Sequence, residues 1–412
     1  MAKRKTIFGF SRNELILIGV DNLRASKASF LGIFLMSFMI SVSLKNSPVG
    51  YIHYHITAYA FYGILSVLLS NTLCKHPVAA WRASLFFSIT RILAVIFISP
   101  TFPLFPIIMG LLIGLESQFY WRPKNLLDVK EVKNERRPRF VSINMIVGEV
   151  LYIVMPVVLG ILISGTSYES TAFVVLAIST LQFILALFFK PTTKITNKQH
   201  SLRDALKTVI GNRALRGLTW TQFLRGFVMT GCAYGVVAQI NIYQSSNSEI
   251  ELGSFQSLGS IAAIIILTIY HRLRKKNQQK SETLIFALLP PYILLPLSAV
   301  LFPGNFIIAI TLYVYEWSVI QALYTSTVFT TYHQNTLKDH VHDDALRIGV
   351  DIIGEIWLCT GRILSFIPLL LLFYTGQDQY MLPLVVVQSI VAPIVVIMVH
   401  KFSTSRAKDK LS

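Results

Sequence analysis

Long apolar runs, separated by short polar segments, follow one another along nearly the whole chain. A stretch of about 20 apolar residues is long enough to cross the ~30 Å hydrocarbon core of a lipid bilayer as a helix. Runs of this length predict twelve membrane spans, six on either side of a polar segment at 190–217. We expect the spans at 13–43, 51–73, 83–99, 102–121, 141–164, 169–189, 218–243, 252–270, 283–303, 305–332, 346–374 and 379–400.

The composition agrees with this pattern. Of the 412 residues, 53% are hydrophobic and 14% are charged, and the mean hydropathy is +0.59. A soluble domain carries about 25% charged residues. The chain is therefore predicted to be an all-α, multi-pass membrane protein. We expect a six-helix N-terminal half at 1–189, a cytoplasmic linker at 190–217 and a six-helix C-terminal half at 218–412.

The basic residues indicate how the spans are oriented. If both termini lie in the cytoplasm, the cytoplasmic segments hold 31 of the 37 Lys and Arg residues, whereas the external loops hold only Lys45. Seven of these basic residues lie in 121–140, seven in 190–217 and five in 271–282. Cytoplasmic loops characteristically carry such an excess. We therefore predict a protein of the cytoplasmic membrane, and assign the +17 net charge to topology and to contact with membrane lipid rather than to nucleic acid.

Four features of the first half recur in the second half after 200–206 residues. The matched pairs are Arg24 with Arg225, Glu116 with Glu316, Glu149 with Glu355, and the basic loop 74–82 with 271–282. Their shared order predicts two six-helix pseudo-repeats of like orientation. Repeats of this kind are common in transporters, whose substrate site lies near the bilayer midplane between the repeats.

Eleven Asp, Glu, Lys and Arg residues lie in the interiors of the predicted spans, beyond the first two residues of each span. They are Asp21, Arg24, Lys27, Arg91, Glu116, Glu149, Arg225, Glu316, Asp351, Glu355 and Arg362. A charge at the centre of a membrane helix costs roughly 2.5–3.5 kcal/mol, so eleven unpaired charges would cost on the order of 30 kcal/mol. Most of them must therefore be paired or face water, as a hydrated central cavity allows. The alternative is that they are structural ion pairs, which we favour for Arg91 because the second half has no matching residue.

Helical spacing and the repeat suggest roles for these side chains. Asp21 and Arg24 share one helix face, and Asp351, Glu355 and Arg362 form a stripe. We predict that the substrate-binding residues are Arg24, Arg225, Tyr313, Gln321 and Tyr324. Glu316, Glu116 and Asp21 are the first candidates for proton coupling, because a buried carboxyl group can hold a proton near neutral pH. We also assign Glu149, Asp351, Glu355 and Arg362 to the predicted site, as buried charges.

Other chemistry has little support. The segment "YHQNTLKDHVHDD" (332–344) gathers histidines and acids, and we interpret it as a solvated loop rather than as a metal site. The sequence contains no phosphate-binding glycine loop, nucleotide motif or Ser/His/Asp arrangement. We therefore expect no enzyme activity, no metal and no cofactor.

The predicted architecture resembles the major facilitator superfamily. Within 116–140, an aromatic string and an Asn-x-x-Arg…Phe loop resemble a poorly characterised branch of transporters in that family; the matching residues are Phe119, Tyr120, Trp121, Asn125, Asn134, Arg137 and Phe140. "MPVVLG" resembles the family's Gly-Pro-x-x-Gly-Gly antiporter element through Pro156 and Gly160. Asp21-x-x-Arg24 is similar to the acidic-x-x-Arg pair of glycolipid-flipping members.

This resemblance implies transport by alternating access, with spans 1, 4, 7 and 10 lining the cavity, and the antiporter element favours export. The segment 70–83 lacks the Asp-Arg pair and the glycines of the family's loop between spans 2 and 3, which leaves its role in gating open. We predict a proton-coupled secondary transporter that acts as a monomer on a small or amphipathic solute. The alternatives are a flippase for lipid-linked substrates or glycolipids and, from another class, a non-transporting membrane receptor or scaffold.

Overall fold

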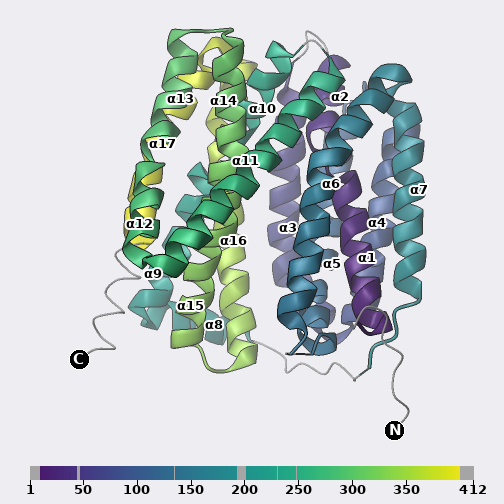
Figure 1. The fold of residues 1–412 in the computed structure, drawn as a ribbon, viewed down its shortest axis with the longest axis vertical. Coiled ribbons are helices and arrows are strands. Elements are labelled where there is room, and N and C mark those ends of the chain that lie inside the picture. Colours follow the sequence, from purple (N-terminus) through teal and green to yellow (C-terminus); the bar gives the residue numbers. More distant parts are fainter. Residues whose placement is uncertain are drawn as a thin grey trace. The chain divides into compact units, whose positions relative to one another are not determined.

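A computed structural model describes residues 10–43, 47–133, 135–192, 201–229, 231–246 and 248–399 (Figure 1). Every regular element within these ranges is a helix. The chain divides into two compact units. One consists of Met1–Lys198 with Ser248–Ser257, and the other of Gln199–Asn247 with Leu258–Ser412. Asn134 and the ends of the chain, on which the predicted cytoplasmic termini depend, lie outside the described residues.

The first unit contains the helices of the N-terminal part of the chain (Figure 1). In order they are α1 (Arg12–Ala28), η1 (Phe30–Phe34), α2 (Leu35–Ser41), α3 (Val49–Lys75), α4 (Pro77–Phe97), α5 (Phe105–Glu131), α6 (Arg137–Gly165) and α7 (Tyr168–Leu187). Element η1 is a π-helical turn that joins α1 to α2, so these three elements form one membrane-length segment, Arg12–Ser41. The divergent segment 70–83 is mostly helical, since His76 alone separates α3 from α4.

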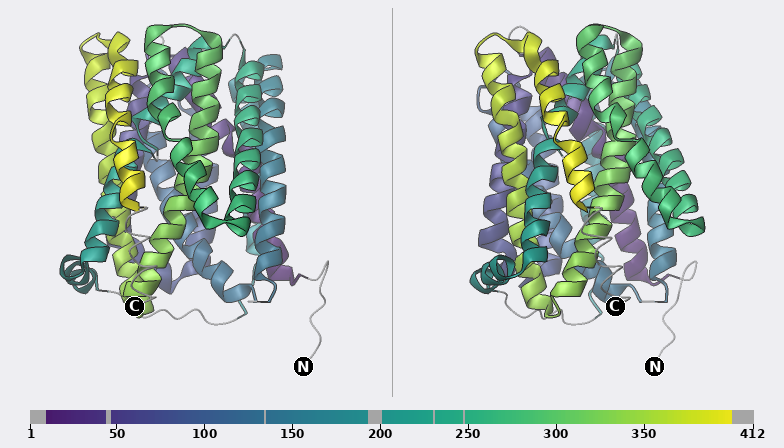
Figure 2. Two further views of the ribbon diagram at one scale, coloured as in Figure 1. Left: turned by 60° about the vertical axis from the view of Figure 1, so that its left-hand side comes forward. Right: turned by 90° about the vertical axis from the view of Figure 1, so that its left-hand side faces the viewer.

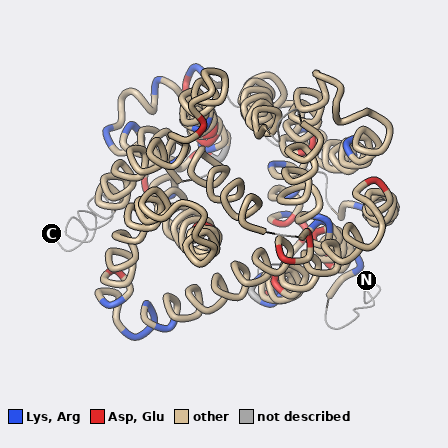
Figure 3. The backbone as a smooth tube through the Cα atoms, turned by 90° about the horizontal axis from the view of Figure 1, so that it is seen from above, with Lys and Arg blue, Asp and Glu red and all other residues tan. Residues whose placement is uncertain are grey.

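The helices of the second unit begin with one short helix (Figure 2). In order they are α8 (Leu202–Gly211), α9 (Arg213–Val228), α10 (Ala233–Ser245), α11 (Glu249–Lys276), α12 (Gln278–Ala287), α13 (Pro290–Leu301), α14 (Phe306–Tyr315), η3 (Glu316–Phe329), α15 (Thr330–His340), α16 (Asp344–Tyr374), η4 (Asp378–Tyr380) and α17 (Met381–Ser389). The first turns of α11 belong to the first unit. The Lys and Arg residues around the turn between α11 and α12 are drawn in blue in Figure 3.

The start of α1 shows how the sequence sets a helix boundary. The Ser11 hydroxyl accepts a hydrogen bond from the Glu14 backbone N–H at 3.3 Å, and the Glu14 carboxylate accepts one from the Ser11 N–H at 2.6 Å. This capping box satisfies two backbone donors that the first helical turn leaves open. The Glu14 carboxylate also pairs with Arg136 at 3.0 Å. One acidic side chain thus begins α1 and holds the segment before α6 against it.

Eleven helical segments in the described residues are long and apolar enough to span a membrane. The predicted span at 102–121 corresponds to α5, which is not among the eleven. Helix α5 has 27 residues and packs against α3 and α4. Its charged residues, among them Glu116, Lys124 and Asp128, lower its hydropathy.

The second unit differs from the sequence-based expectation in two places. The segment 332–344, interpreted as a loop, is helical as far as His340, because α15 continues the helix of η3. The polar segment at 190–217 contains α8, and α9 begins at Arg213 rather than at 218. In both places the helix consists largely of polar residues. Hydropathy does not reveal such a helix, because it identifies apolar runs and not helicity.

Candidate functional site

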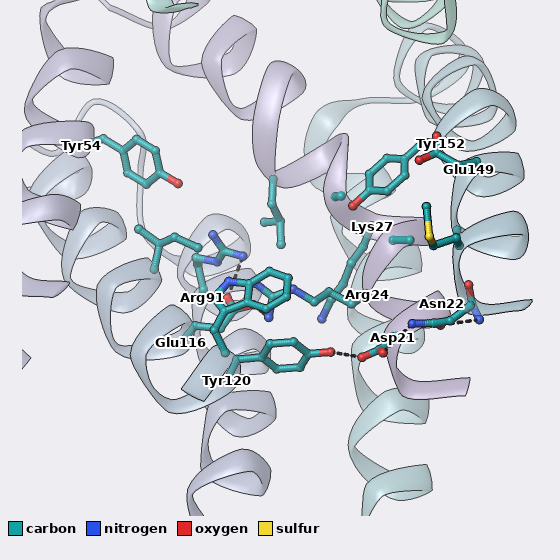
Figure 4. A pocket seen from close by; sticks show the side chains of 18 residues that line it. Asp21, Asn22, Arg24, Lys27, Tyr54, Arg91, Glu116, Tyr120, Glu149 and Tyr152 are labelled. Atoms are coloured by element: carbon teal, nitrogen blue, oxygen red, sulfur yellow. Dashed lines mark hydrogen bonds and ion pairs between the residues drawn. The ribbon is translucent and has the colours of Figure 1, made fainter. Parts of the chain in front are cut away.

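The first unit contains a cavity of about 410 Å³ (Figure 4). Helices α1, α3, α4, α5 and α6 contribute its walls. Its charged and aromatic lining residues are Asp21, Arg24, Lys27, Tyr54, Arg91, Glu116, Tyr120, Trp121, Glu149 and Tyr152. The structure thus brings together four site residues that the sequence predicts for the N-terminal half: Asp21, Arg24, Glu116 and Glu149.

Glu116 is the central acid of this cavity. Its side chain is 3% exposed, and its carboxylate lies 2.7 Å from the guanidinium of Arg91, which is equally buried. The guanidinium of Arg24 lies farther away, at 3.6 Å from the other carboxylate oxygen. Because a short, buried ion pair is held more tightly than a long one, Arg91 is the main partner of Glu116.

The guanidinium group of Arg24 has hydrogen-bond donors that its neighbours do not use. Its guanidinium carbon lies 3.9 Å from the ring centroid of Tyr120 and 4.9 Å from that of Trp121. Stacking of this kind leaves the N–H donors at the edge of the guanidinium plane available. The Arg24 Nη1 atom is buried without a hydrogen bond to the described residues, although the side chain as a whole is 20% exposed. Arg24 therefore presents unused donors to the cavity.

Asp21 is enclosed by hydrogen-bond donors. Its carboxylate accepts from the Tyr120 hydroxyl at 2.5 Å and from the Asn144 amide at 2.9 Å. It also pairs with Lys124 at 2.8 Å, and that ammonium group in turn pairs with Asp128 at 2.7 Å. Sequence reasoning counted Lys124 among the basic residues of the 121–140 segment and missed it as the partner of Asp21. The only signal was its position on α5, two turns after Glu116.

Lys27 lies deep in the same unit. It is 2% exposed, and its ammonium group donates to the hydroxyls of Ser88 at 2.7 Å and Ser179 at 2.8 Å. These serines come from α4 and α7, so Lys27 ties three helices together. No carboxylate of the described residues lies within ion-pair distance of it.

Glu149 lines another part of the cavity, next to Tyr152 on α6 (Figure 4). It is partly exposed, and among the described residues nothing forms a hydrogen bond or ion pair with it. The cavity therefore contains one carboxylate, Glu149, that no cation of the described residues contacts. It also contains the guanidinium of Arg24, which has a donor without a hydrogen bond to this part of the chain.

In the second unit, the matching arginine has different partners. Arg225 donates to the Gln222 side-chain oxygen at 3.2 Å and to the Thr325 carbonyl at 3.3 Å, and it lies 5.7 Å from the Phe329 ring centroid. Gln222 also contacts His333 Nδ1 at 2.7 Å, and His333 Nε2 contacts Asp351 at 2.5 Å. Sequence reasoning missed Gln222 and His333, since it placed His333 in a solvated loop.

Glu316 also differs from its counterpart in the first unit. It is 3% exposed, and Gln321 donates to its Oε1 atom at 2.7 Å. Within the described part of the chain, its Oε2 atom has no hydrogen-bond partner and no cation pairs with it. Gly235 makes room for it, because a Cβ atom at that position would lie 2.8 Å from Glu316 Oε1.

The two predicted tyrosines of the tenth span are fully enclosed. Tyr313 and Tyr324 are 1% and 0% exposed, and the Tyr324 hydroxyl donates to the Ile285 carbonyl at 2.6 Å. Glu355 and Arg362 both lie on α16, where Gly361 allows a close approach to α9. A Cβ atom at Gly361 would lie 2.9 Å from the Phe227 nitrogen, which explains why this crossing requires a residue without a side chain.

Three of the residues that carry the family resemblance also have structural roles. Tyr120 and Phe140 lie in the hydrophobic core of the first unit with Trp81. Arg137 donates to the Val129 carbonyl at 3.0 Å and so satisfies an acceptor at the end of α5.

The segment that resembles the antiporter element provides a close helix contact. A Cβ atom at Gly160 on α6 would lie 3.1 Å from the Cα atom of Ile250. Pro156 lies inside the same helix, where its carbonyl faces Gly253. These contacts let α6 approach the first turns of α11, which belong to the same unit.

Comparisons with known proteins agree with this architecture. Residues 25–342 match the model of the Major Facilitator Superfamily. Uncharacterized protein YqgE of Bacillus subtilis (strain 168) is 24% identical over 281 residues, which are 68% of this chain and 64% of that protein. The chain therefore matches less than two thirds of the length of this relative.

Two solved structures share the fold at low sequence identity. A bacterial homologue of the iron transporter ferroportin in its inward-facing state is 15% identical, with 97% of this chain and 100% of that chain covered and a TM-score of 0.65. A POT family transporter in complex with a thioalcohol-conjugated peptide is 14% identical, with 97% and 98% covered and a TM-score of 0.66. The chain is a multi-pass membrane protein with a transporter fold, and it belongs to the Major Facilitator Superfamily.

Proposed function

We propose that the protein is a secondary transporter that moves a small or amphipathic solute across the cytoplasmic membrane by alternating access. Arg24 binds an anionic or polar group of this solute. The observation that carries the proposal is the state of the Arg24 side chain, which is stacked on Tyr120 and 3.6 Å from Glu116, with a buried Nη1 atom that has no hydrogen bond to the described residues. An anion on Arg24 would satisfy these donors and leave the shorter Arg91–Glu116 pair intact.

The size and lining of the cavity support a small-molecule substrate. Its volume of about 410 Å³ falls in the range of small-ligand sites. Aromatic rings of Tyr120, Trp121 and Tyr152 supply apolar contact area, while Arg24 and Glu149 supply opposite charges. The similarity of the 155–160 segment to the antiporter element favours export as the direction.

We propose Glu316 as the proton-coupling residue. Burial of a carboxylate without a cation is costly, and protonation removes that charge. Asp21 and Glu116 are each held by at least one cation, whereas Glu316 is held by the Gln321 amide. In proteoliposomes, Glu316→Gln should abolish flux driven by a pH gradient, and the exposed control Glu169→Gln should preserve it. Unchanged gradient dependence in Glu316→Gln would exclude this assignment.

We further propose that α5 is a twelfth span, which makes two six-helix halves with both termini in the cytoplasm. Twenty-seven residues at 1.5 Å each reach about 40 Å, enough to cross the bilayer. Pairing of Glu116 with Arg91, and of Lys124 with Asp21, offsets the charges that lower the hydropathy of α5. Labelling of single cysteines placed in the α4–α5 and α5–α6 connections, from each side of the membrane, tests this topology.

The first experiment is a thermal-shift panel on the full-length protein in detergent. It covers sugars, sugar phosphates, organic acids, organic cations, peptides and soluble lipid headgroups. A ligand at about 100 times its dissociation constant stabilises the folded state by roughly 2.7 kcal/mol. We expect a compound with an anionic group to stabilise the wild-type protein and the exposed control Arg216→Ala, but not Arg24→Ala.

Three outcomes would change the proposal. A stabilising compound that still binds Arg24→Ala with wild-type affinity would remove Arg24 from the site. Stabilisation by the lipid headgroups alone, together with an altered leaflet distribution of a labelled lipid, would indicate a flippase. A ligand that binds without any flux in proteoliposomes would indicate a receptor rather than a transporter.

A further inference from the structure

A chain of hydrogen bonds crosses three helices of the second unit. Arg225 on α9 donates to Gln222 at 3.2 Å, one turn away on the same helix. The Gln222 amide nitrogen lies 2.7 Å from Nδ1 of His333, on α15. The other ring nitrogen of His333, Nε2, lies 2.5 Å from the Asp351 carboxylate on α16. The imidazole thus bridges α9 and α16 through its two nitrogens.

The two ends of this chain determine its direction. A guanidinium group can only donate hydrogen bonds, and a carboxylate can only accept them. Nε2 of His333 must therefore carry the proton that faces Asp351, which leaves Nδ1 of the neutral ring as an acceptor. Gln222 must then turn its NH₂ group to His333 and its oxygen to Arg225. Each group donates to the next, from Arg225 to Asp351.

A second proton on His333 is incompatible with this arrangement. Nδ1 would then carry a hydrogen that faces the NH₂ group of Gln222, so two donors would meet. Rotation of the Gln222 amide by 180° removes that conflict, because its oxygen then accepts from His333. The same rotation turns the NH₂ group toward Arg225, whose guanidinium has no acceptor to offer. A proton on His333 therefore breaks the Arg225–Gln222 hydrogen bond.

We propose that His333 is a positioning residue that couples proton binding to the placement of the Arg225 guanidinium through Gln222. The inference rests on the proposed transport function, in which Arg225 is the second-unit counterpart of Arg24. With His333 neutral, Arg225 is held by Gln222 and by the Thr325 carbonyl. With His333 protonated, Arg225 loses its hydrogen bond to Gln222 while its bond to the Thr325 carbonyl remains, so the guanidinium changes its position relative to an anion.

Other charged groups surround this chain of hydrogen bonds. On α16, Glu355 and Arg362 are within electrostatic range of Arg225, and Asp351 contacts His333 directly. On α15 itself, Lys338, Asp339 and His340 are exposed. Element η3 contributes to this region the Thr325 carbonyl, and its acid Glu316 lies at the opposite end of the element. Of the two histidines in this region, His333 is the one whose two ring nitrogens both have hydrogen-bond partners among the described residues.

The test uses the full-length protein in detergent micelles, with ¹⁵N-labelled histidine and arginine, and follows both by NMR during a pH titration. The chain has only nine histidines, and the variant His333→Gln assigns the signal of interest. We expect neutral His333 as the Nε2–H tautomer, and an Arg225 signal that shifts with the same midpoint as His333. In Gln222→Met the Arg225 shift should be lost while His333 still titrates. The control His340→Gln should leave both curves unchanged.

Three results would overturn the proposal. They are an Nδ1–H tautomer, an Arg225 signal that does not follow the His333 midpoint, and an Arg225 shift that persists in Gln222→Met. No solute is needed, so failure here is distinct from failure of the transport proposal, which the thermal-shift panel and flux measurements decide. If Gln222→Met does not fold, Gln222→Glu replaces it. Its carboxylate can accept from both Arg225 and protonated His333, so the Arg225 shift should again be lost.

Discussion

Glu116 and Glu316 match in the repeat that the sequence predicts, yet their replacement by glutamine should have different consequences for stability. Glu116→Gln removes the negative charge that faces Arg91 at 2.7 Å, and the Arg91 side chain is only 3% exposed. Glu316→Gln leaves no cation behind among the described residues, because Glu316 contacts an amide instead. The same chemical change therefore creates a buried, unpaired charge in one half and none in the other.

The structure sets the expected magnitude. Removal of one partner of a buried ion pair costs about 3–5 kcal/mol. In Glu116→Gln the neutral amide oxygen can still face the Arg91 guanidinium, and Arg24 is partly exposed, so we expect the lower end, about 3 kcal/mol. Glu316→Gln preserves shape and hydrogen bonding, and should change the free energy of unfolding by less than about 1 kcal/mol.

The assay is reversible unfolding of each full-length variant by sodium dodecyl sulfate in mixed micelles, followed by circular dichroism. A control variant also removes the unpaired charge of Arg91. Arg91→Met combined with Glu116→Gln should recover most of the lost stability, since an apolar side chain replaces the unpaired cation. Equal destabilisation by the two single variants, or a larger loss in Glu316→Gln, would refute the assignment of their environments.

Two further changes test other parts of the first unit. Lys27→Met should alter stability by less than about 1 kcal/mol, because it removes a buried ammonium that is held by the hydroxyls of Ser88 and Ser179 and not by a carboxylate; a loss of about 3 kcal/mol in the same unfolding assay would contradict this. Glu149→Gln should raise the affinity for an anionic solute roughly threefold to tenfold by removing an uncompensated negative charge from the cavity. Titration of the solute found in the panel measures this, and an unchanged or weaker affinity would place Glu149 outside the electrostatic reach of the ligand.

Much of the fold was predictable because hydropathy is a local property. Each of the membrane-length segments from Arg12–Ser41 to Asp378–Val399 contains a long apolar window, which can be recognised from neighbouring residues alone. The exceptions are instructive. In α15, and in the part of α5 that continues beyond the predicted span 102–121, the helix contains residues whose polar side chains are satisfied by other helices, as Lys124 is by Asp21 and His333 by Asp351. Hydropathy cannot anticipate partners that lie far away in the sequence.

By itself, the sequence determined that the chain is a membrane protein built mainly of spanning helices, where most of those helices run, and which ionisable residues lie inside them. Those properties depend on neighbours along the chain. Only the tertiary structure decided which side chains interact. Glu116 forms an ion pair with Arg91, whereas Glu316 accepts a hydrogen bond from Gln321. Lys27 donates to two serines, and His333 contacts both Gln222 and Asp351. Pair formation requires atoms within about 4 Å, and helix packing alone brings residues as distant in the sequence as Arg24 and Glu116 that close together.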